Sequence, residues 1–199
     1  MTATLDIYNL ALRHVGVSTE VQSLTERSKE RAACQRYYEQ AVDEVLRDFP
    51  WPFATRFEAL AVVEEDPTSE WAFSYRWPAD CLTPHRLLSG ARNDSAASRI
   101  PYRIAGDVSG RLILTDLEDA ELEYTARVTT VAQFAPDFVR ALSLLLASYI
   151  GPSFGPDATR LANRALELYQ MAIGRAQANA ANEGQPDVPV ESSFITVRD

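Results

Sequence analysis

The chain opens with apolar residues at helical spacing. Leu5, Tyr8 and Leu12 share one side of a helix that the pattern predicts over residues 3–15, and polar residues occupy the other side. Gly16 is expected to end this helix.

The clearest signal is an apolar stripe in the next segment. Apolar and aromatic residues recur at i, i+3, i+4, i+7 and onward, which predicts an amphipathic helix over residues 26–48. Pro50 and Pro52 then stop the helix, because proline lacks a backbone N–H and clashes with the preceding turn. The stripe consists of Cys34, Tyr37, Tyr38, Ala41, Val42, Val45, Leu46 and Phe49.

Between residues 53 and 130 the period changes from helical to alternating. Phe73, Tyr75 and Trp77 alternate with smaller or polar residues, which is typical of a strand. Short turn-forming links separate the later strands, so antiparallel pairing as a meander or small barrel is expected. Pro101 favours an edge position for its strand. The later alternating stretches are 100–104, 112–114 and 122–128.

Helical spacing returns in the second half of the chain. Residues 136–150 are apolar on nearly every face, which predicts a central, buried helix with Pro136 in its first turn. A last helix is predicted from Asp157 to Gly184 at the latest. Residues 185–199 contain two prolines and no helical period, so they are interpreted as an extended C-terminal arm.

This order of elements predicts an α+β fold. Residues 1–52 and 131–184 form a part like a four-helix bundle, residues 53–130 are an inserted antiparallel β domain, and residues 185–199 are the arm. Two helix pairs separated by strands must meet to cover their apolar stripes.

Trp51 and Phe53 lie where the predicted helical part gives way to the β domain. The flanking prolines set the chain direction there, and aromatic side chains bury large areas at such junctions. We therefore expect both side chains to provide the packing between the two domains.

Composition narrows the function classes. The 199 residues are 46% hydrophobic and 24% charged, as in ordinary globular chains, and the net charge is −9. Such a charge disfavours tight sequence-independent DNA binding, which depends on Lys and Arg neutralising phosphates. The apolar stretch 141–150 is about half the length that a bilayer span requires, so neither a membrane anchor nor a secretory signal is predicted.

Eighteen of the 19 basic residues are arginine, the exception being Lys29. A GC-rich genome explains this bias as well as selection for carboxylate pairing does. The predicted helix 26–48 carries six acidic and five basic residues opposite its stripe, so Arg27, Arg31 and Arg36 are candidates for a subunit interface. A solvated face with pairs within the helix is the alternative.

Recognisable catalytic motifs are missing from the sequence. It has no Gly-rich phosphate loop, HExxH, GxSxG or Cys/His cluster, and no catalytic residue, metal or cofactor is predicted. Asp80, Cys81 and His85 are close together in a predicted loop. Nucleophile and base are normally brought together by the fold, so a structural role is favoured for these three residues.

Six motifs follow one another along the chain: ALRHVGV at 11–17, FPWPFA at 49–54, WAFSYRWPADCL at 71–82, LEYTARV at 122–128, P-x-F-x-x-A-L-x-x-x-L-A at 136–147 and the closing SSFITVRD. In this order they resemble the tail tubular protein A family, the head-to-tail adaptor or gatekeeper proteins of short-tailed bacteriophages. The resemblance covers nearly the whole chain, with Phe194 where the family pattern has Trp.

The resemblance implies a virion protein at the head-to-tail junction, made and assembled in the bacterial host cytoplasm. Copies would form a ring, usually twelvefold, between the portal and a tail nozzle like tail tubular protein B, with genomic DNA passing through the lumen. The C-terminal arm would insert into the portal. Its candidate docking residues are Val190, Phe194, Ile195, Val197 and Arg198.

Two other functions remain as alternatives. A small DNA-binding or packaging-accessory protein would use basic residues such as Arg27 and Arg31. A hydrolase would use Cys81 and His85, although the sequence carries no lytic motif.

Overall fold

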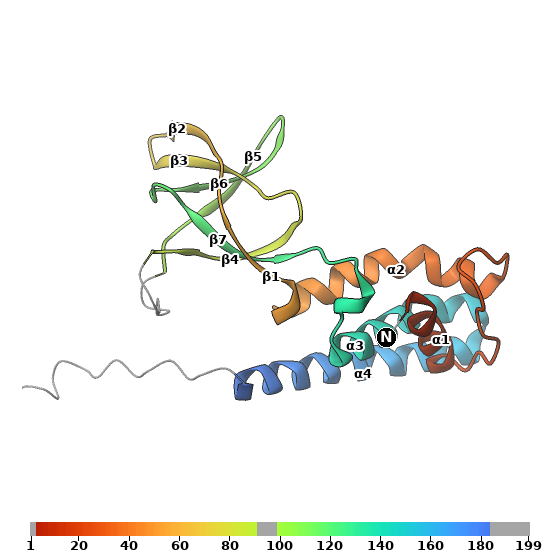
Figure 1. Cartoon of the computed structure of the whole chain (residues 1–199). Helices are drawn as coiled ribbons and strands as arrows, with labels where there is room; N and C mark the ends of the chain where they lie inside the picture. Colours follow the sequence, from red (N-terminus) through yellow and green to blue (C-terminus); the bar gives the residue numbers. More distant parts are fainter. Residues whose placement is uncertain (1–2, 91–98, 184–199) are drawn as a thin grey trace, which may run out of the picture.

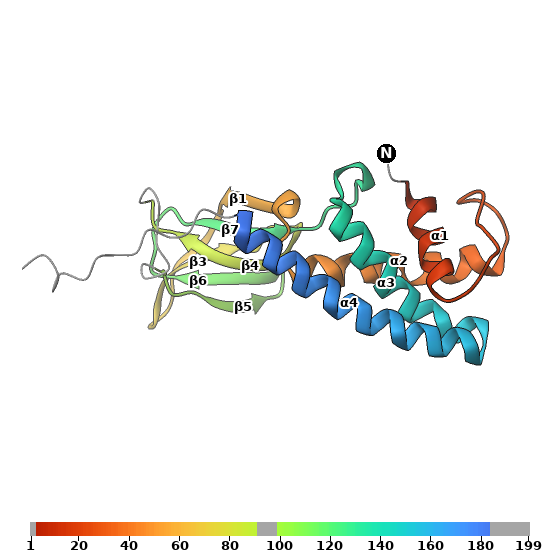
Figure 2. The same cartoon turned by 90° about the horizontal axis from the view of Figure 1, so that it is seen from below.

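The chain folds as an α+β protein in which a helical part and a β part lie at opposite ends of the molecule (Figure 1). This computed structural model describes residues 3–90 and 99–183. Figure 2, seen from below, shows the strands beyond one end of α1 and α3, and the last turns of α4 overlap the strands in this view.

The first two helices are α1 (Thr4–His14) and α2 (Lys29–Asp48). The backbone N–H of Arg31 donates to the Ser28 hydroxyl at 3.2 Å, so serine caps the start of α2. The helix ends where Phe49 turns to extended backbone ahead of Pro50. It therefore begins later than the sequence pattern predicts.

Helix α3 (Pro136–Ile150) contacts the other three helices. Ten of its 15 residues are buried, so the prediction of a central, buried helix is confirmed. The 3-10 turn η4 (Gly151–Phe154) follows, and Gly155, with φ of 106°, reverses the chain into α4 (Pro156–Glu183).

Seven strands in the described residues form two antiparallel sheets, one ordered β1-β7-β4 and the other β2-β3-β6-β5. The predicted meander is wrong, because β1 pairs with the distant β7 and not with β2, and β3 pairs with the distant β6 as well as with its neighbour β2. The strands are β1 (Thr55–Ala59), β2 (Val62–Thr68), β3 (Trp71–Arg76), β4 (Cys81–Leu88), β5 (Arg103–Asp107), β6 (Gly110–Thr115) and β7 (Glu121–Ala126).

The two sheets share a corner where β1 runs into β2. The N–H of Leu60 donates to the Ala120 carbonyl at 2.8 Å on the β7 side, and the Ala61 carbonyl accepts from the Arg76 N–H at 2.9 Å on the β3 side. Side chains of both sheets, among them Tyr75, make a core of their own.

Several local predictions need correction. Cys81 and His85 lie on β4 instead of in a loop, and the strand predicted from residue 100 begins at Arg103. Glu64 and Glu65 belong to β2. Strand β2 carries exposed carboxylates because it lies at a sheet edge, where polar side chains face water and discourage pairing with other chains.

Candidate interaction surfaces

Trp51 lies at the point where the chain leaves α2 for the β part. Its side chain is 3% exposed, and its indole N–H donates to the Val45 carbonyl at 2.8 Å. That carbonyl belongs to the last turn of α2, where the helix itself supplies no donor. Phe49 and Phe138 meet the indole edge-on, with ring centroids 4.9 and 5.1 Å away.

Phe53 follows in the short turn η1 (Pro52–Ala54). Its ring is half-buried and lies 5.1 Å from that of Phe138 and 5.9 Å from that of Phe134, which precedes α3. Trp51 and Phe53 thus pack against the helical core at the entrance to β1.

An ion-pair cluster lies at the return crossing, where the chain passes from β7 back to the helices. Arg127 follows β7, and its side chain donates to Asp43 at 2.6 Å and to Glu39 at 3.3 Å, both on α2. The hydrogen bond to Asp43 raises the pKa of Arg127 above its ordinary value, so its guanidinium keeps its charge. A small hollow of about 90 Å³ beside the cluster is lined by Tyr38, Glu39, Val42, Arg127, Thr129 and Phe134.

The three candidate interface arginines do not share one helical face. Arg27 precedes the cap residue of α2, which contradicts the expectation that it lies on the helix with Arg31. Arg31 is half-buried and donates to Gln35, while Arg36 is exposed. Arg36 lines a groove of about 190 Å³ with Lys29, Ala32, Ala33, Tyr37 and Ser153.

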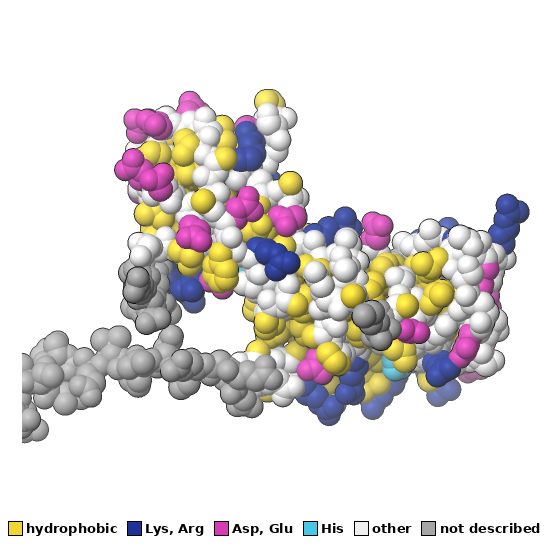
Figure 3. Space-filling model, viewed as in Figure 1, with side chains coloured by type: hydrophobic (Ala, Val, Ile, Leu, Met, Phe, Trp, Pro, Cys, Tyr) yellow, Lys and Arg dark blue, Asp and Glu magenta, His cyan; other side chains and the backbone are white. Residues whose placement is uncertain are grey.

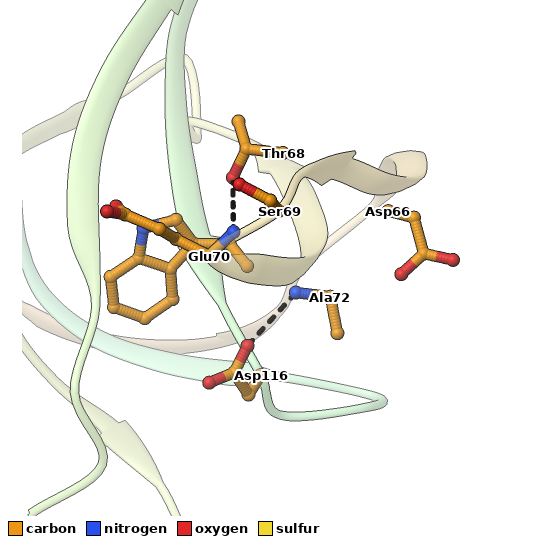
Figure 4. Close-up of a pocket in the computed structure, with 7 residues that line it drawn as sticks. Asp66, Thr68, Ser69, Glu70, Ala72 and Asp116 are labelled. Atoms are coloured by element: carbon orange, nitrogen blue, oxygen red, sulfur yellow. Dashed lines mark hydrogen bonds between the residues drawn. The ribbon is translucent and has the colours of Figure 1, made fainter.

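Carboxylates gather on the end of the β part that lies away from the helices (Figure 3). The start of β3 meets the β6–β7 connection there, where the Ala72 N–H donates to Asp116 at 3.0 Å. Asp66, Glu70 and Asp116 help to line an open hollow of about 480 Å³ (Figure 4). Among the described residues, however, no group of three or more His, Cys, Asp or Glu side chains is arranged to hold a metal ion.

The candidate catalytic residues each have other contacts. Burial raises the pKa of the Cys81 thiol to about 12, so the thiol stays protonated at neutral pH. His85 Nε2 lies 2.8 Å from the Thr125 hydroxyl, and the Asp80 carboxylate lies 3.0 Å from the Tyr124 hydroxyl. These contacts support the structural interpretation that the sequence favoured.

Exposed apolar side chains lie on the strands that border the open sheet edges. Phe57 of β1 is 58% exposed, and Val62 and Ile104 are about half exposed. Val108, in the turn between β5 and β6, is fully exposed. The sequence does not mark these residues as exposed, because alternation predicts a strand without telling which face a partner sheet will cover.

Arg127 was missed as well. Its carboxylate partners lie 84 and 88 residues earlier in the chain, and no local spacing relates them. The arm residues Val190, Phe194, Ile195, Val197 and Arg198 lie outside the described residues.

No protein-family model matches the chain, and a search of curated proteins finds no match either. None of the described helices is both long and apolar enough to cross a membrane. The resemblance of the six motifs therefore stays the basis of a proposal.

Acidification from about pH 7 to about pH 5 is expected to lower the thermal stability of the chain. Burial lowers the pKa of both His14 and His85 below the ordinary 6.5; Arg140 adds to the effect at His14, while Glu123 opposes it at His85. The unfolded chain therefore takes up protons first as the pH falls. The stabilisation by the two neutral histidines is complete above their ordinary pKa of 6.5. It is lost as the pH falls through the lower pKa values of the folded state.

Melting temperatures of the wild type, His14→Gln and His85→Gln across this pH range provide the measurement. Each variant should show a shallower pH dependence than the wild type. If the melting temperature of the double variant, His14→Gln with His85→Gln, depends on pH as steeply as that of the wild type, the effect belongs to carboxylates instead.

Proposed function

We propose that the chain is a non-enzymatic adaptor at the head-to-tail junction of a short-tailed bacteriophage. In this role, copies form a ring on the portal, twelvefold as the resemblance implies, receive the tail nozzle and help to retain the packaged DNA. The genomic DNA passes through the lumen without sequence-specific contacts.

The observation that carries the proposal is the order of the six family motifs together with the elements on which they fall. FPWPFA covers the crossing from α2 into β1, where Trp51 is buried. LEYTARV contains most of β7 and ends just after Arg127, at the return crossing. The P-x-F motif at 136–147 lies within the buried helix α3.

The proposal assigns different partners to the two ends of the molecule. The helices, taken as a bundle-like part, face the portal and neighbouring subunits, and the strands, taken as a small barrel, face the tail. The corner between β1 and β2 joins the two sheets of this part. An acidic chain along the lumen would repel DNA weakly and let it slide.

The arm provides the sharpest test. Deleting residues 185–199 is expected to leave the melting temperature nearly unchanged but to abolish stable attachment to the portal protein of the same phage. Segments rich in β-branched and aromatic residues can add to a sheet edge or fill a groove on another chain. Phe194→Ala with Ile195→Ala should weaken attachment, whereas the matched control Ser192→Ala with Ser193→Ala should not.

Mass photometry of the chain with and without the portal reports both assembly and attachment. We expect the purified chain to be mainly monomeric, because ordering the arm costs about 1–2 kcal/mol of backbone entropy per residue, which portal contacts must offset. A truncated chain that binds the portal with unchanged affinity would move the docking site to the helices. If the full chain does not bind the portal at all, the adaptor role is wrong.

Duplex-DNA binding across a salt series separates the adaptor from the DNA-binding alternative. Tight binding that weakens steeply with salt would favour a DNA-binding protein, since such a slope reports phosphate contacts. Weak binding is expected for the adaptor.

A further inference from the structure

The described hydrophobic side chains form two separate cores. One core belongs to the helices and includes Trp51 and Val128 at the two chain crossings. The other lies between the sheets around Tyr75. Leu82 of β4 is a strand residue that packs against the helical core. The two parts therefore each have their own apolar interior, and they share a joint at which β4 and β7 contact α2.

Arg127 holds both sides of that joint. Its backbone N–H donates to the Asp80 carbonyl at 2.7 Å, which fixes its main chain to the turn before β4. Its side chain reaches the other part, where Asp43 and Glu39 of α2 accept its hydrogen bonds. One residue thus connects the backbone of the β part to the side chains of the helical part.

This connection is polar and reached by water. The Arg127 side chain is 38% exposed, and those of Asp43 and Glu39 are 33% and 82% exposed. Dissolved salt screens ion pairs in such positions and weakens them. By contrast, the packing within each core is apolar and insensitive to salt.

We propose that the two chain crossings, residues 51–54 and 127–130, form a hinge, and that Arg127 is the latch that selects one orientation of the β part. With the latch closed, the β part keeps the position seen in Figure 1. With the latch open, each part keeps its own fold while the angle between them varies. The inference does not depend on the proposed adaptor role.

A pair of spin labels on the full chain can measure this angle. Ser69 in the β2–β3 turn and Asn163 on α4 are exposed positions, one on each part, suitable for Ser69→Cys and Asn163→Cys. The native Cys34 and Cys81 are buried, and burial raises the pKa of both thiols to about 12, so they react slowly with the label. Pulsed electron paramagnetic resonance then gives the distribution of distances between the labels.

At low salt, the labelled parent is expected to give one narrow distribution. Arg127→Gln and, separately, Asp43→Asn should give a broader distribution with a shifted mean, because the orientation is no longer selected. Arg103→Gln is the matched control, since Arg103 is an exposed arginine whose ion pair with Glu70 lies within the β part. It should leave the distribution unchanged.

High salt applied to the parent tests the latch without any risk of misfolding. Screening should broaden the parent's distribution towards that of Arg127→Gln and leave Arg127→Gln itself unaltered. The proposal is overturned if Arg127→Gln keeps the narrow distribution, if the parent is already as broad at low salt, or if high salt has no effect on the parent.

Discussion

Replacing Trp51 with alanine is expected to lower the free energy of unfolding by about 3–5 kcal/mol, the range for removing a fully buried aromatic side chain. The indole is 3% exposed and packs edge-on against Phe49 and Phe138, so its removal leaves a cavity at the base of α2. It also leaves the Val45 carbonyl without its donor.

Two variants separate these contributions in urea unfolding. Trp51→Phe keeps an aromatic ring but loses the hydrogen bond, and it should cost about 1–3 kcal/mol, the desolvation penalty of an unpaired buried carbonyl. Trp71→Ala is the matched control, because Trp71 is only partly buried and its indole N–H has no hydrogen-bond partner. A Trp51→Ala chain as stable as Trp71→Ala would show that the junction is not packed as described.

Gly151→Ala is expected to cost about 1–3 kcal/mol or more through overpacking. A Cβ atom at this position would lie 2.3 Å from the Ala162 Cβ and 2.8 Å from the Ala158 carbonyl oxygen. Both neighbours belong to α4, and one of them is backbone, so the turn η4 must move away from that helix.

Gly174, which lies on α4, provides the opposite case. A Cβ there would meet no atom within 4 Å, so Gly174→Ala should stabilise the chain by about 0.5–1 kcal/mol through reduced backbone entropy. Thermal unfolding of the two variants in parallel gives the comparison. If Gly151→Ala does not lower the melting temperature, the close approach at Gly151 is wrong.

The helices show how far a local pattern reaches. The stripe along α2 and the uniformly apolar α3 needed only periodicity to be found, since a helix side chain repeats every 3.6 residues whatever its partner is. The start of α2 was misplaced because a polar stretch gives no period, and the hydroxyl cap on Ser28 decided the boundary.

The pairing of the strands could not be predicted from local periodicity. Strand β1 pairs with β7, whose partner residues lie more than 60 positions away, as Thr55 and Thr125 do. Turn residues indicated that strands alternate in direction, but the crossover from one sheet to the other depends on packing around Leu60. Alternation alone does not choose among such pairings.

The sequence by itself determined the α+β class and the division into helical and β segments. It also predicted that aromatic side chains pack around Trp51. These follow from local spacing and from proline. Only the tertiary structure decided that Arg127 meets Asp43 and Glu39. Such contacts join residues distant in sequence, and their geometry exists only after both cores have packed.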